Sequence, residues 1–530
     1  MFSTFKKSLK FLSNELFLSK IVSFIEKKKN LNQNEKINKS QKTLLVEFNS
    51  YYSFFIVIYY LTLYFKQTHK LRLLCFYNFF VIKNNFENLF FKRFYIKLSF
   101  KLSLHFAKLY NMIGFTDLIV PKANYSHISQ IQKDLNKIKN LNTLLKFKIN
   151  NTLVGDLLYD TYLKKFQVPT IDIKTEKFKN FFNEFNLLVY FWIDYFKNNK
   201  IDFIVGSHLS YSYGIPLRFG KKYKANSIVA TLDTIYSLKH QNQFQVENWI
   251  FKKKKFSLKE KMKNRKWSLN KLNDIFSGND LKITPSLKVS SFSKLKKKSM
   301  IKKSKKLKVL VLPHDFFDAP HAWGDHGIFT DYFKWLEFIS NMIDKTDYEW
   351  YIKTHPNYVG NFGINQKKSR EMIGRMFKNR KKVTILPSDY SHKQIITEKI
   401  DCLISCHGSS LYEYSYNGIM SIASSKFLPW RHFKICIVPK SLKDLENKIL
   451  NLKKMKKNFK VNKNEILDYF YLRFNYYKHT SWLLPFREYS QFVGGWHKRH
   501  SPKIFEYWIK NYKKINLAKK NRLIKSFLRL

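Results

Sequence analysis

The second half of the chain contains short apolar segments that alternate with helical patterns, and this alternation restricts the fold more than any other feature. The first segment, Leu307–Pro313, reads LKVLVLP and is apolar throughout after its lysine. Such continuous runs are typical of strands buried on both faces, as in parallel sheets. The pattern then predicts a helix at Thr330–Met342, strands at Trp350–Thr354 and Val383–Leu386, a helix at His392–Lys399, a strand at Asp401–Ser405, a helix at Ser410–Asn417 and a strand at Met420–Ala423.

The first half repeats this alternation in a sparser form. Strands are predicted at Thr43–Phe48 and Leu71–Phe76, with an apolar helix at Tyr52–Phe65 between them, and further strands at Ile201–Val205 and Ser227–Thr231. A strand, a helix and a strand at this spacing form a βαβ unit, which also requires a parallel sheet covered on both faces. The predicted fold class is therefore α/β, with two Rossmann-like doubly wound domains.

Changes of composition set the expected domain boundaries. Lysine runs with few apolar residues, such as KKKKFSLKEKMKNRKW, are typical of a solvated linker. The last residues are rich in Tyr, Trp and Lys and are expected to be helices that can cross back onto the first domain. The expected units are a basic arm at 1–42, a first domain at 43–245, a Lys-rich linker at 246–306, a second domain at 307–460 and a helical basic tail at 461–530.

The charge balance is extreme and has two explanations. The 530 residues include 97 Lys and Arg against 38 Asp and Glu, a net charge of +59. Clustered lysines favour a polyanionic partner, which is nucleic acid, an anionic membrane surface or a phosphorylated substrate. Abundant Lys, Asn, Ile, Phe and Tyr with few Gly and Pro also follow from an AT-rich coding sequence. No helix-turn-helix, RNA-recognition or zinc signature supports nucleic-acid binding.

The cysteines and the amino terminus bear on the cellular compartment. Cys75, Cys402, Cys406 and Cys436 have no disulfide or zinc spacing, which fits a reducing cytoplasm, and Cys402 and Cys406 are expected to be small core residues. No signal peptide is evident. The most apolar window, Tyr52–Phe65, is shorter than the ~20 residues that span a bilayer. We expect a soluble or peripheral protein.

Polar residues follow the strand Trp350–Thr354. His355 can give a hydrogen bond to a phosphate oxygen, and Pro356 would stiffen the turn that aims it. Lys353 lies two residues before His355 and would add positive charge. An isolated His-Pro pair is more often a simple turn, so its meaning depends on what lies beside it.

A second polar group follows the strand Asp401–Ser405. His407, Gly408, Ser409 and Ser410 open the next predicted helix. Glycine lets backbone come close to a ligand, and a helix amino terminus presents free N–H groups. Glu413 lies one turn into the helix, where it can reach the hydroxyls of a ribose. The alternative is that Ser409 is an ordinary helix cap with no ligand.

Together the two groups resemble the second half of GT-B glycosyltransferases for bacterial capsular and surface polysaccharides. Similar His-Pro and Ser-Ser motifs mark polysialyl- and Kdo-transferases and the CDP-glycerol glycerophosphotransferases. The segment GSSLYEYSYNG also resembles the GT-B pattern Gly-x-x-x-x-Glu-x-x-x-x-Gly. The resemblance covers roughly 307–425 and departs from the family at Gly418-Ile419-Met420, where Gly-x-Pro is usual.

The resemblance implies two domains facing across a cleft and a nucleotide donor, with CMP- or CDP-linked donors favoured. It places His355, Ser409 and Ser410 on the donor phosphate and Glu413 on the ribose, with Lys353, Pro356, His407 and Gly408 beside them. It also implies catalysis without a metal ion or another cofactor.

The loop after Leu307–Pro313 is dense in histidine and acidic residues. They are His314, Asp315, Asp318, His321, Asp325, His326 and Asp331. Their spacing matches no zinc signature, so no metal site is predicted. In GT-B proteins this loop faces the cleft, which favours donor or acceptor contacts through His314, His321 and Asp325 and a catalytic contribution from Asp318. A solvated loop is the alternative.

A general base is sought in the first domain. His208 follows the strand Ile201–Val205, and imidazole titrates near neutrality, as a base for an acceptor hydroxyl requires. Asp156 and Asp160 are alternatives, and a purely structural role for His208 is equally open.

The sequence thus predicts a glycosyltransferase that uses a nucleotide-sugar donor and a surface-polysaccharide or glycolipid acceptor, near the anionic inner-membrane surface and without nucleic acid. The alternatives are transfer of glycerol phosphate or another polyol phosphate from a CDP donor and, less favoured, a basic nucleic-acid-binding protein.

Overall fold

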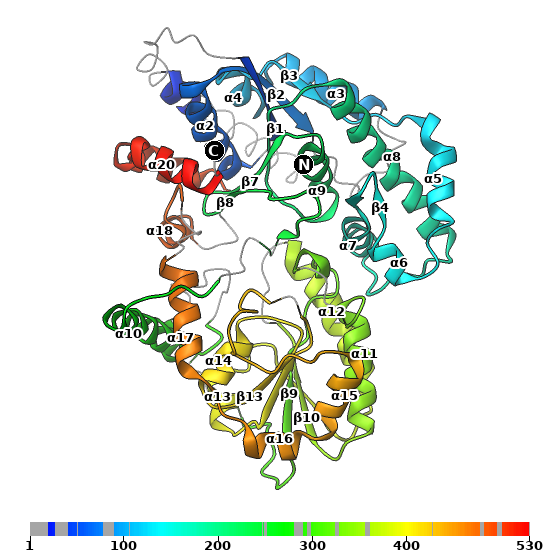
Figure 1. Cartoon of the computed structure of the whole chain (residues 1–530), viewed down its shortest axis with the longest axis vertical. Helices are drawn as coiled ribbons and strands as arrows, with labels where there is room; N and C mark the ends of the chain where they lie inside the picture. Colours follow the sequence, from blue (N-terminus) through cyan, green and yellow to red (C-terminus); the bar gives the residue numbers. More distant parts are fainter. Residues whose placement is uncertain are drawn as a thin grey trace, which may run out of the picture.

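A computed structural model of the chain shows two α/β domains, one above the other, joined by the linker and by the carboxyl-terminal helices (Figure 1). The structure describes residues 20–26, 41–49, 51–77, 90–104, 106–245, 247, 252–279, 290–293, 298–323, 328–355, 361–426, 428–476, 482–494 and 501–528.

The first domain is built on a six-stranded sheet. All neighbouring strands are parallel except the last pair, β7 and β8. In spatial order the strands are β3 (Asp117–Ile119), β2 (Lys70–Tyr77), β1 (Gln41–Phe48), β6 (Phe203–Gly206), β7 (Asn226–Ala230) and β8 (Ile235–Ser237). This is the strand order of a Rossmann fold.

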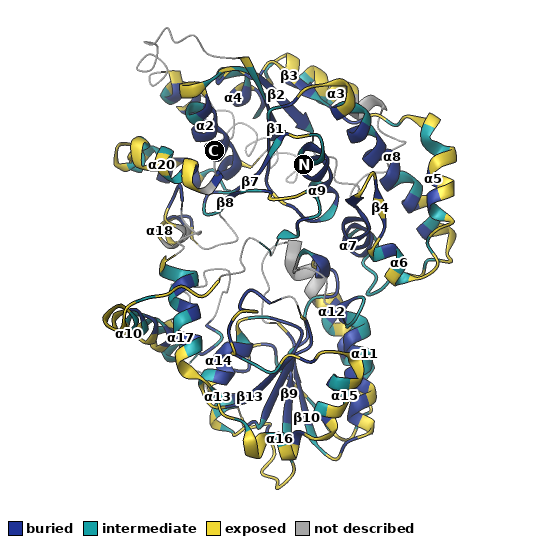
Figure 2. Ribbon diagram, in the orientation of Figure 1, coloured by how far each residue is buried: buried dark blue, intermediate teal, exposed yellow. Residues whose placement is uncertain are grey.

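Successive strand residues pack into different cores, because side chains of a strand alternate between the two faces of the sheet. Leu44 and Val46 of β1 lie in the core that contains α2 (Tyr52–Thr68), whereas Leu45 lies in the core that contains α8 (Glu176–Asn198). Helix α2 is buried along most of its length and is therefore the core helix that its apolar sequence predicts (Figure 2).

The remaining elements of the first domain surround these cores. The helices are α3 (Phe90–Lys101), α4 (Phe106–Met112), η2 (Tyr125–His127), α5 (Ile128–Leu135), α6 (Leu141–Leu145), α7 (Gly155–Phe166), η3 (Tyr211–Tyr213) and α9 (Gly214–Lys222). A small antiparallel hairpin joins β4 (Lys148–Ile149) to β5 (Thr152–Leu153).

The second domain contains a five-stranded, fully parallel sheet. The spatial order is β11 (Val383–Leu386), β10 (Glu349–Lys353), β9 (Lys308–Val311), β12 (Cys402–Ser405) and β13 (Met420–Ala423). Its helices are η7 (Pro320–Trp323), α11 (Tyr332–Asp344), α12 (Asn361–Phe377), α13 (His392–Thr397), α14 (Ser410–Tyr416), α15 (Leu442–Leu450) and α16 (Leu452–Asn458). Val309 and Val311 pack towards α11, and Leu310 packs towards α14.

The carboxyl-terminal helices return to the first domain, as their sequence predicts. The chain runs through α17 (Lys463–Tyr471), η8 (Leu472–Tyr476), α18 (Phe486–Phe492), α19 (Lys503–Asn511), η10 (Tyr512–Lys514) and α20 (Leu517–Leu528). Figure 1 shows α17 beside the second domain and α20 near α2 of the first. Trp508 is buried in the α2 core, where its indole N–H donates to the hydroxyl of Tyr60 at 2.9 Å.

One segment is more ordered than the sequence predicts. The Lys-rich linker contains α10 (Leu258–Asp274), followed by η5 (Ile275–Asn279). A capping box of Ser257 and Glu260 begins α10, and Arg265 holds it to α17 through a bidentate pair with Asp468. In the basic arm, residues 20–26 form a helix whose Ile21 and Ile25 are buried in the first domain.

The predicted fold class is confirmed: two doubly wound, Rossmann-like α/β domains with a helical carboxyl-terminal extension. Cys402 and Cys406 are buried core residues, as predicted. Among the residues that the structure describes, no helix is both long and apolar enough to cross a bilayer.

Candidate functional site

Both sheets reverse their strand order at one point, and doubly wound sheets bind ligands outside the carboxyl ends of the strands at that point. In the second domain the reversal lies between β9 and β12. In the first domain it lies between β1 and β6. The candidate site is therefore built from the loops that leave these strands.

The loops after β9 and β12 are tied together by two stacked histidines. The rings of His314 and His407 lie 4.1 Å apart, and His314 Nε2 donates to the carbonyl of His407 at 3.0 Å. His407 Nε2 also lies 2.6 Å from the hydroxyl of Tyr332, which begins α11. His407 is buried, so its ring supports the loop and positions His314.

A second buried pair lies at the end of β10. Lys353 Nζ donates to Nε2 of His392 at 3.4 Å, and His392 Nδ1 lies 2.7 Å from the hydroxyl of Tyr414 on α14. His355, two residues beyond Lys353, borders this region: protein atoms surround the imidazole, while part of the residue faces solvent. The site thus combines residues from the ends of three strands that are neighbours in the sheet, β10, β9 and β12.

The positively charged forms of these histidines and of Lys353 are disfavoured, because most of these side chains lie in one buried region. Burial is the main cause that lowers the pKa of His314 to about 4, and the charge of His355 adds to it. Burial also lowers the pKa of Lys353 to about 8 and that of His392 well below its usual value. The pKa of His355 shifts downward too, through desolvation and then through Lys353. A bound anion would favour the charged forms of these groups and raise their pKa values.

The loop from Gly408 into α14 adds backbone and hydroxyl groups to the same edge. Gly408 has a φ of +120°, which favours glycine over any side chain. A Cβ placed there would lie 3.9 Å from Cε1 of His314, so the glycine is adjacent to the histidine cluster. Ser409 is exposed, Ser410 begins α14, and Glu413 is buried one turn later.

The first-domain side of the site contains a hydrogen-bonded chain of three residues. Glu47 near the end of β1 is buried and accepts from the backbone N–H of Ser207 at 2.7 Å and from its hydroxyl at 2.8 Å. The same hydroxyl lies 2.9 Å from Nδ1 of His208, whose ring is exposed. Sequence reasoning found His208 but missed Glu47. Glu47 lies 160 residues before Ser207 in the chain, so only the folded sheet brings the two into contact.

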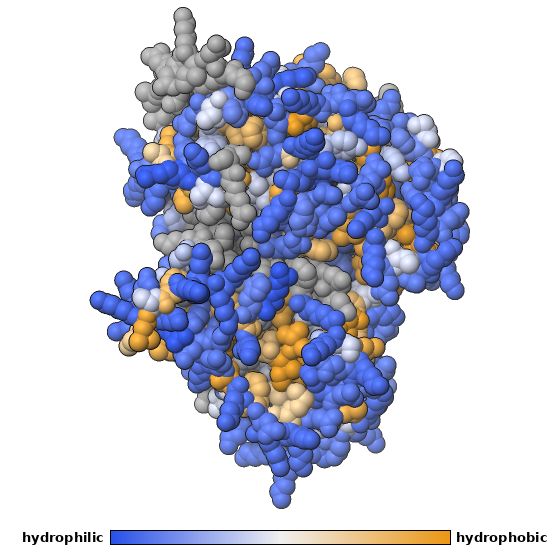
Figure 3. Space-filling model, viewed as in Figure 1, coloured by the Kyte–Doolittle hydropathy of each residue, from blue (hydrophilic) through white to orange (hydrophobic). Residues whose placement is uncertain are grey.

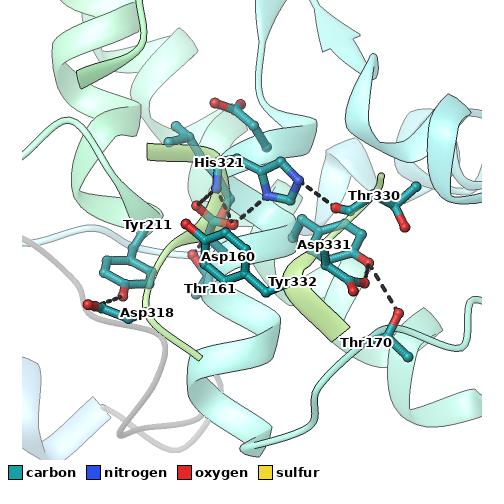
Figure 4. Close-up of polar contacts among 12 residues, drawn as sticks. Asp160, Thr161, Thr170, Tyr211, Asp318, His321, Thr330, Asp331 and Tyr332 are labelled. Carbon is teal, nitrogen blue, oxygen red and sulfur yellow. Dashed lines mark hydrogen bonds and ion pairs between the residues drawn. The ribbon is translucent and has the colours of Figure 1, made fainter. Parts of the chain in front are cut away.

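The loop after β9 crosses to the first domain and contacts α7 and η3 (Figure 4). His321 Nδ1 lies 2.6 Å from Asp160, and its Nε2 donates to the carbonyl of Thr330 at 2.8 Å. The hydroxyl of Tyr211 donates to Asp318 at 3.3 Å. Tyr211 and Ala319 both have left-handed backbone, with φ of 54° and 41°. Such backbone is costly and is retained where surrounding contacts enforce it.

The Asp160–His321 pair is buried between the domains. Burial lowers the pKa of His321, but the charge and the hydrogen bond of Asp160 outweigh this and raise it overall. Both ring nitrogens face acceptors, so the imidazolium form fits this position. His321 therefore holds the two domains together, and a direct donor or acceptor contact by its ring stays a prediction.

Asp156 has a different environment. Its two carboxylate oxygens accept from Nη1 and Nη2 of Arg218 at 2.6 and 2.7 Å, and both side chains are buried. This bidentate pair within the first domain suits a structural role.

The structure thus brings together His314, Lys353, His355, His407 and Gly408 in one domain, with Asp318 in the loop that reaches the other. Ser409, Ser410 and Glu413 follow Gly408 into α14, and their contact with a ligand stays a prediction. Pro356 and Asp325 lie outside the described residues. The residues that sequence reasoning missed at this edge are His392 and Tyr332, because each meets the cluster only through tertiary packing. Within the described ranges, no group of three or more His, Cys, Asp or Glu side chains is arranged to hold a metal ion.

Comparisons with known proteins add little. No protein-family model matches the sequence, and a search of curated proteins gives no match. Among solved structures, KpsC of Thermosulfurimonas dismutans, a beta Kdo 2,4 transferase, is 9% identical over 51% of this chain and 79% of that chain, with a TM-score of 0.31. UDP-GlcNAc 2-epimerase of Methanocaldococcus jannaschii is 12% identical over 82% of this chain and 99% of that chain, with a TM-score of 0.23. Overlaps this low carry no argument, so the fold rests on strand order and on the contacts described above.

Proposed function

We propose that this chain is a glycosyltransferase that moves a sugar from a nucleotide-sugar donor to a surface-polysaccharide or glycolipid acceptor. The observation that carries the proposal is the convergence of Lys353, His355 and His314 at the switch point of the second sheet. A group of cationic and N–H donors there suits a phosphate. The likeness of these residues to the GT-B motifs supports sugar transfer as the chemistry.

In this proposal the second domain binds the donor. His355, Ser409 and Ser410 contact the phosphate, and Glu413 contacts the ribose. Lys353 adds positive charge at the end of β10, and Gly408 lets the backbone come close to the phosphate. His314 completes the phosphate side. CMP- or CDP-linked donors are favoured by the resemblance.

The first domain would bind the acceptor, with His208 as the general base for its hydroxyl. Asp318 reaches towards this domain through Tyr211 and would help to align the two halves. Catalysis would come from alignment of donor and acceptor, from removal of the hydroxyl proton and from stabilisation of the departing phosphate by the second domain. None of these roles requires a metal ion.

The test is a thermal-shift screen with CMP, CDP, UDP and GDP on the wild type and on His355→Ala. We expect a cytidine nucleotide to raise the melting temperature of the wild type and His355→Ala to lose most of that shift. His240→Ala is the matched control, because His240 is an exposed histidine of the first domain that pairs with Glu247. If no nucleotide shifts the wild type, or if His355→Ala responds as the wild type does, the donor site is refuted.

Transfer of glycerol phosphate or another polyol phosphate from a CDP donor is the second candidate, because it would use the same phosphate cluster. The mass of the product separates the two: a hexose or a Kdo residue adds a different mass from glycerol phosphate.

We also propose that the protein binds an anionic inner-membrane surface, where lipid-linked acceptors lie. Helix α10 carries an apolar stripe that faces solvent, with Leu258 76% and Met262 68% exposed. Exposed lysines, Lys259, Lys263 and Lys266, flank the stripe. Figure 3 shows hydrophobic side chains among hydrophilic ones where α10 projects from the molecule. Apolar residues beside lysines on a helix suit the boundary between headgroups and acyl chains.

A further inference from the structure

The hydrogen-bonded chain of Glu47, Ser207 and His208 has a fixed direction, because its first member can only accept. Hydrogen bonds from several donors favour the ionised form of a buried carboxyl group, and an ionised carboxylate has no proton to donate. Three donors point at Glu47: the backbone N–H of Ser207, the hydroxyl of Ser207 and the amide of Asn49, at 2.7, 2.8 and 3.1 Å. The hydroxyl of Ser207 therefore gives its only proton to Glu47.

This direction determines which nitrogen of His208 carries the proton. Because the Ser207 hydroxyl has given its proton to Glu47, it can only accept from Nδ1 of His208, which lies 2.9 Å away. A neutral imidazole has one protonated and one unprotonated nitrogen. With the proton on Nδ1, Nε2 is the nitrogen that can receive one.

We propose that Glu47 is a positioning residue that, through Ser207, holds His208 in the Nδ1-protonated form and so makes Nε2 the base. The inference rests on the proposed function, in which His208 faces the acceptor. In the transfer step Nε2 takes the proton of the acceptor hydroxyl while that oxygen bonds to the donor sugar carbon. The bond between that carbon and the phosphate oxygen breaks, and its electrons leave with the nucleotide.

The location supports this role. Glu47 and Ser207 lie at the carboxyl ends of β1 and β6, the two strands between which the order of the first sheet reverses. Glu47 is only 1% exposed, and His208 is exposed. A buried carboxylate thus lies behind an accessible imidazole at the position where this fold places ligands. In hydrolases a carboxylate that bonds directly to the catalytic imidazole sets its tautomer; here the hydroxyl of Ser207 lies between the two groups.

The experiment is nitrogen NMR of the full-length protein labelled with ¹⁵N-histidine, with the His208 signals assigned by comparison with His208→Gln. We expect the wild type to carry the proton on Nδ1 at a pH where the ring is neutral. Ser207→Ala removes the acceptor for Nδ1 but leaves the backbone bond to Glu47, and it should move the proton to Nε2. Glu47→Gln should do the same, because the amide of Gln can donate to the Ser207 hydroxyl. That hydroxyl could then donate its own proton to Nδ1 of His208.

Asn49→Ala is the matched control, because Asn49 contacts Glu47 without contacting Ser207 or His208 through its side chain. It should keep the wild-type tautomer. If Glu47→Gln does not fold, Ser207→Ala decides the matter alone. A wild type with the proton on Nε2, or a Ser207→Ala variant that keeps it on Nδ1, would overturn the proposal. The readout needs no substrate, so a failure of the nucleotide screen and a failure of this inference are told apart.

Discussion

At the scale of single residues, the second-domain site consists of groups whose burial disfavours their positively charged forms. Burial lowers the pKa of His314 to about 4, so this ring is neutral at physiological pH. Lys353 keeps its charge up to about pH 8 because burial lowers its pKa to about that value. The site is therefore a set of N–H donors around one ammonium, and the ammonium supplies most of the attraction for an anion.

This gives a prediction for the pH dependence of nucleotide binding. A bound phosphate stabilises the charged form of Lys353, so affinity is greatest below its pKa of about 8 and falls as the pH rises through that value. Lys353→Met should weaken binding at pH 7 by roughly tenfold to one hundredfold, as expected for loss of a hydrogen bond to a charged group. Isothermal titration calorimetry from pH 6 to 9 measures both.

The variant also provides the control for this titration. Lys353→Met should lose the decrease above pH 8 as well as the affinity. If its affinity changes with pH in the same way as that of the wild type, another group is responsible and Lys353 does not contact the phosphate.

At the scale of elements, the loop into α14 depends on one backbone conformation. Gly408 has a φ of +120°, whereas Gly374 lies inside α12 with open space where a side-chain carbon would be. We expect Gly408→Ala to lower the free energy of unfolding by about 1–3 kcal/mol and to weaken nucleotide binding. Gly374→Ala, the matched control, should raise stability by about 0.5–1 kcal/mol, because alanine favours a helix interior. Urea unfolding and the thermal-shift screen measure these effects, and equal results for the two variants would contradict the prediction.

Helix α10 leads to a prediction about membrane association. Met262 belongs to the exposed apolar stripe, and Asn270 is exposed on the same helix. Met262→Glu and Asn270→Glu change the net charge equally, so their difference measures insertion of the stripe. We expect Met262→Glu to reduce co-sedimentation with vesicles of phosphatidylglycerol and phosphatidylcholine by at least about fivefold and Asn270→Glu to reduce it much less. Equal losses would mean that charge alone drives binding.

At the scale of the whole molecule, the buried Asp160–His321 pair joins the two domains and makes their stability depend on pH. The pKa of His321 is raised in the folded protein, because Asp160 outweighs the effect of burial. The folded state therefore binds more protons than the unfolded state above the ordinary histidine pKa of about 6.5. The contribution is present below that pH and is lost as the pH rises through the folded pKa.

We expect His321→Gln to lower the melting temperature most near pH 6, with a cost of about 3–5 kcal/mol for one partner of a buried pair. The difference between the wild type and the variant should shrink as the pH rises towards 9. Differential scanning calorimetry across this range checks it. A difference that stays constant or grows with pH would show that the imidazolium is not what holds the domains.

The sequence by itself determined most strands of the two sheets and the edge of the second sheet where the candidate site lies. The strands Val383–Leu386 and Met420–Ala423 were predicted with the bounds that the structure has, because each is a short and mainly apolar run. His355 and Gly408 were predicted at strand ends because a parallel sheet places all its carboxyl ends at one edge. These are local signals, which a single stretch of sequence contains.

Only the tertiary structure decided which distant side chains meet. Glu47 contacts Ser207 across 160 residues, and His321 contacts Asp160 across 161. Helix α10 lies in a segment whose lysines predict a solvated linker, but Arg265 and Asp468 hold it against α17. Such pairs depend on strand order, on register and on where the carboxyl-terminal helices pack. None of these produces a periodic pattern in the sequence. His208 is linked to the carboxylate of Glu47 through Ser207 only because β1 and β6 are neighbours in the sheet.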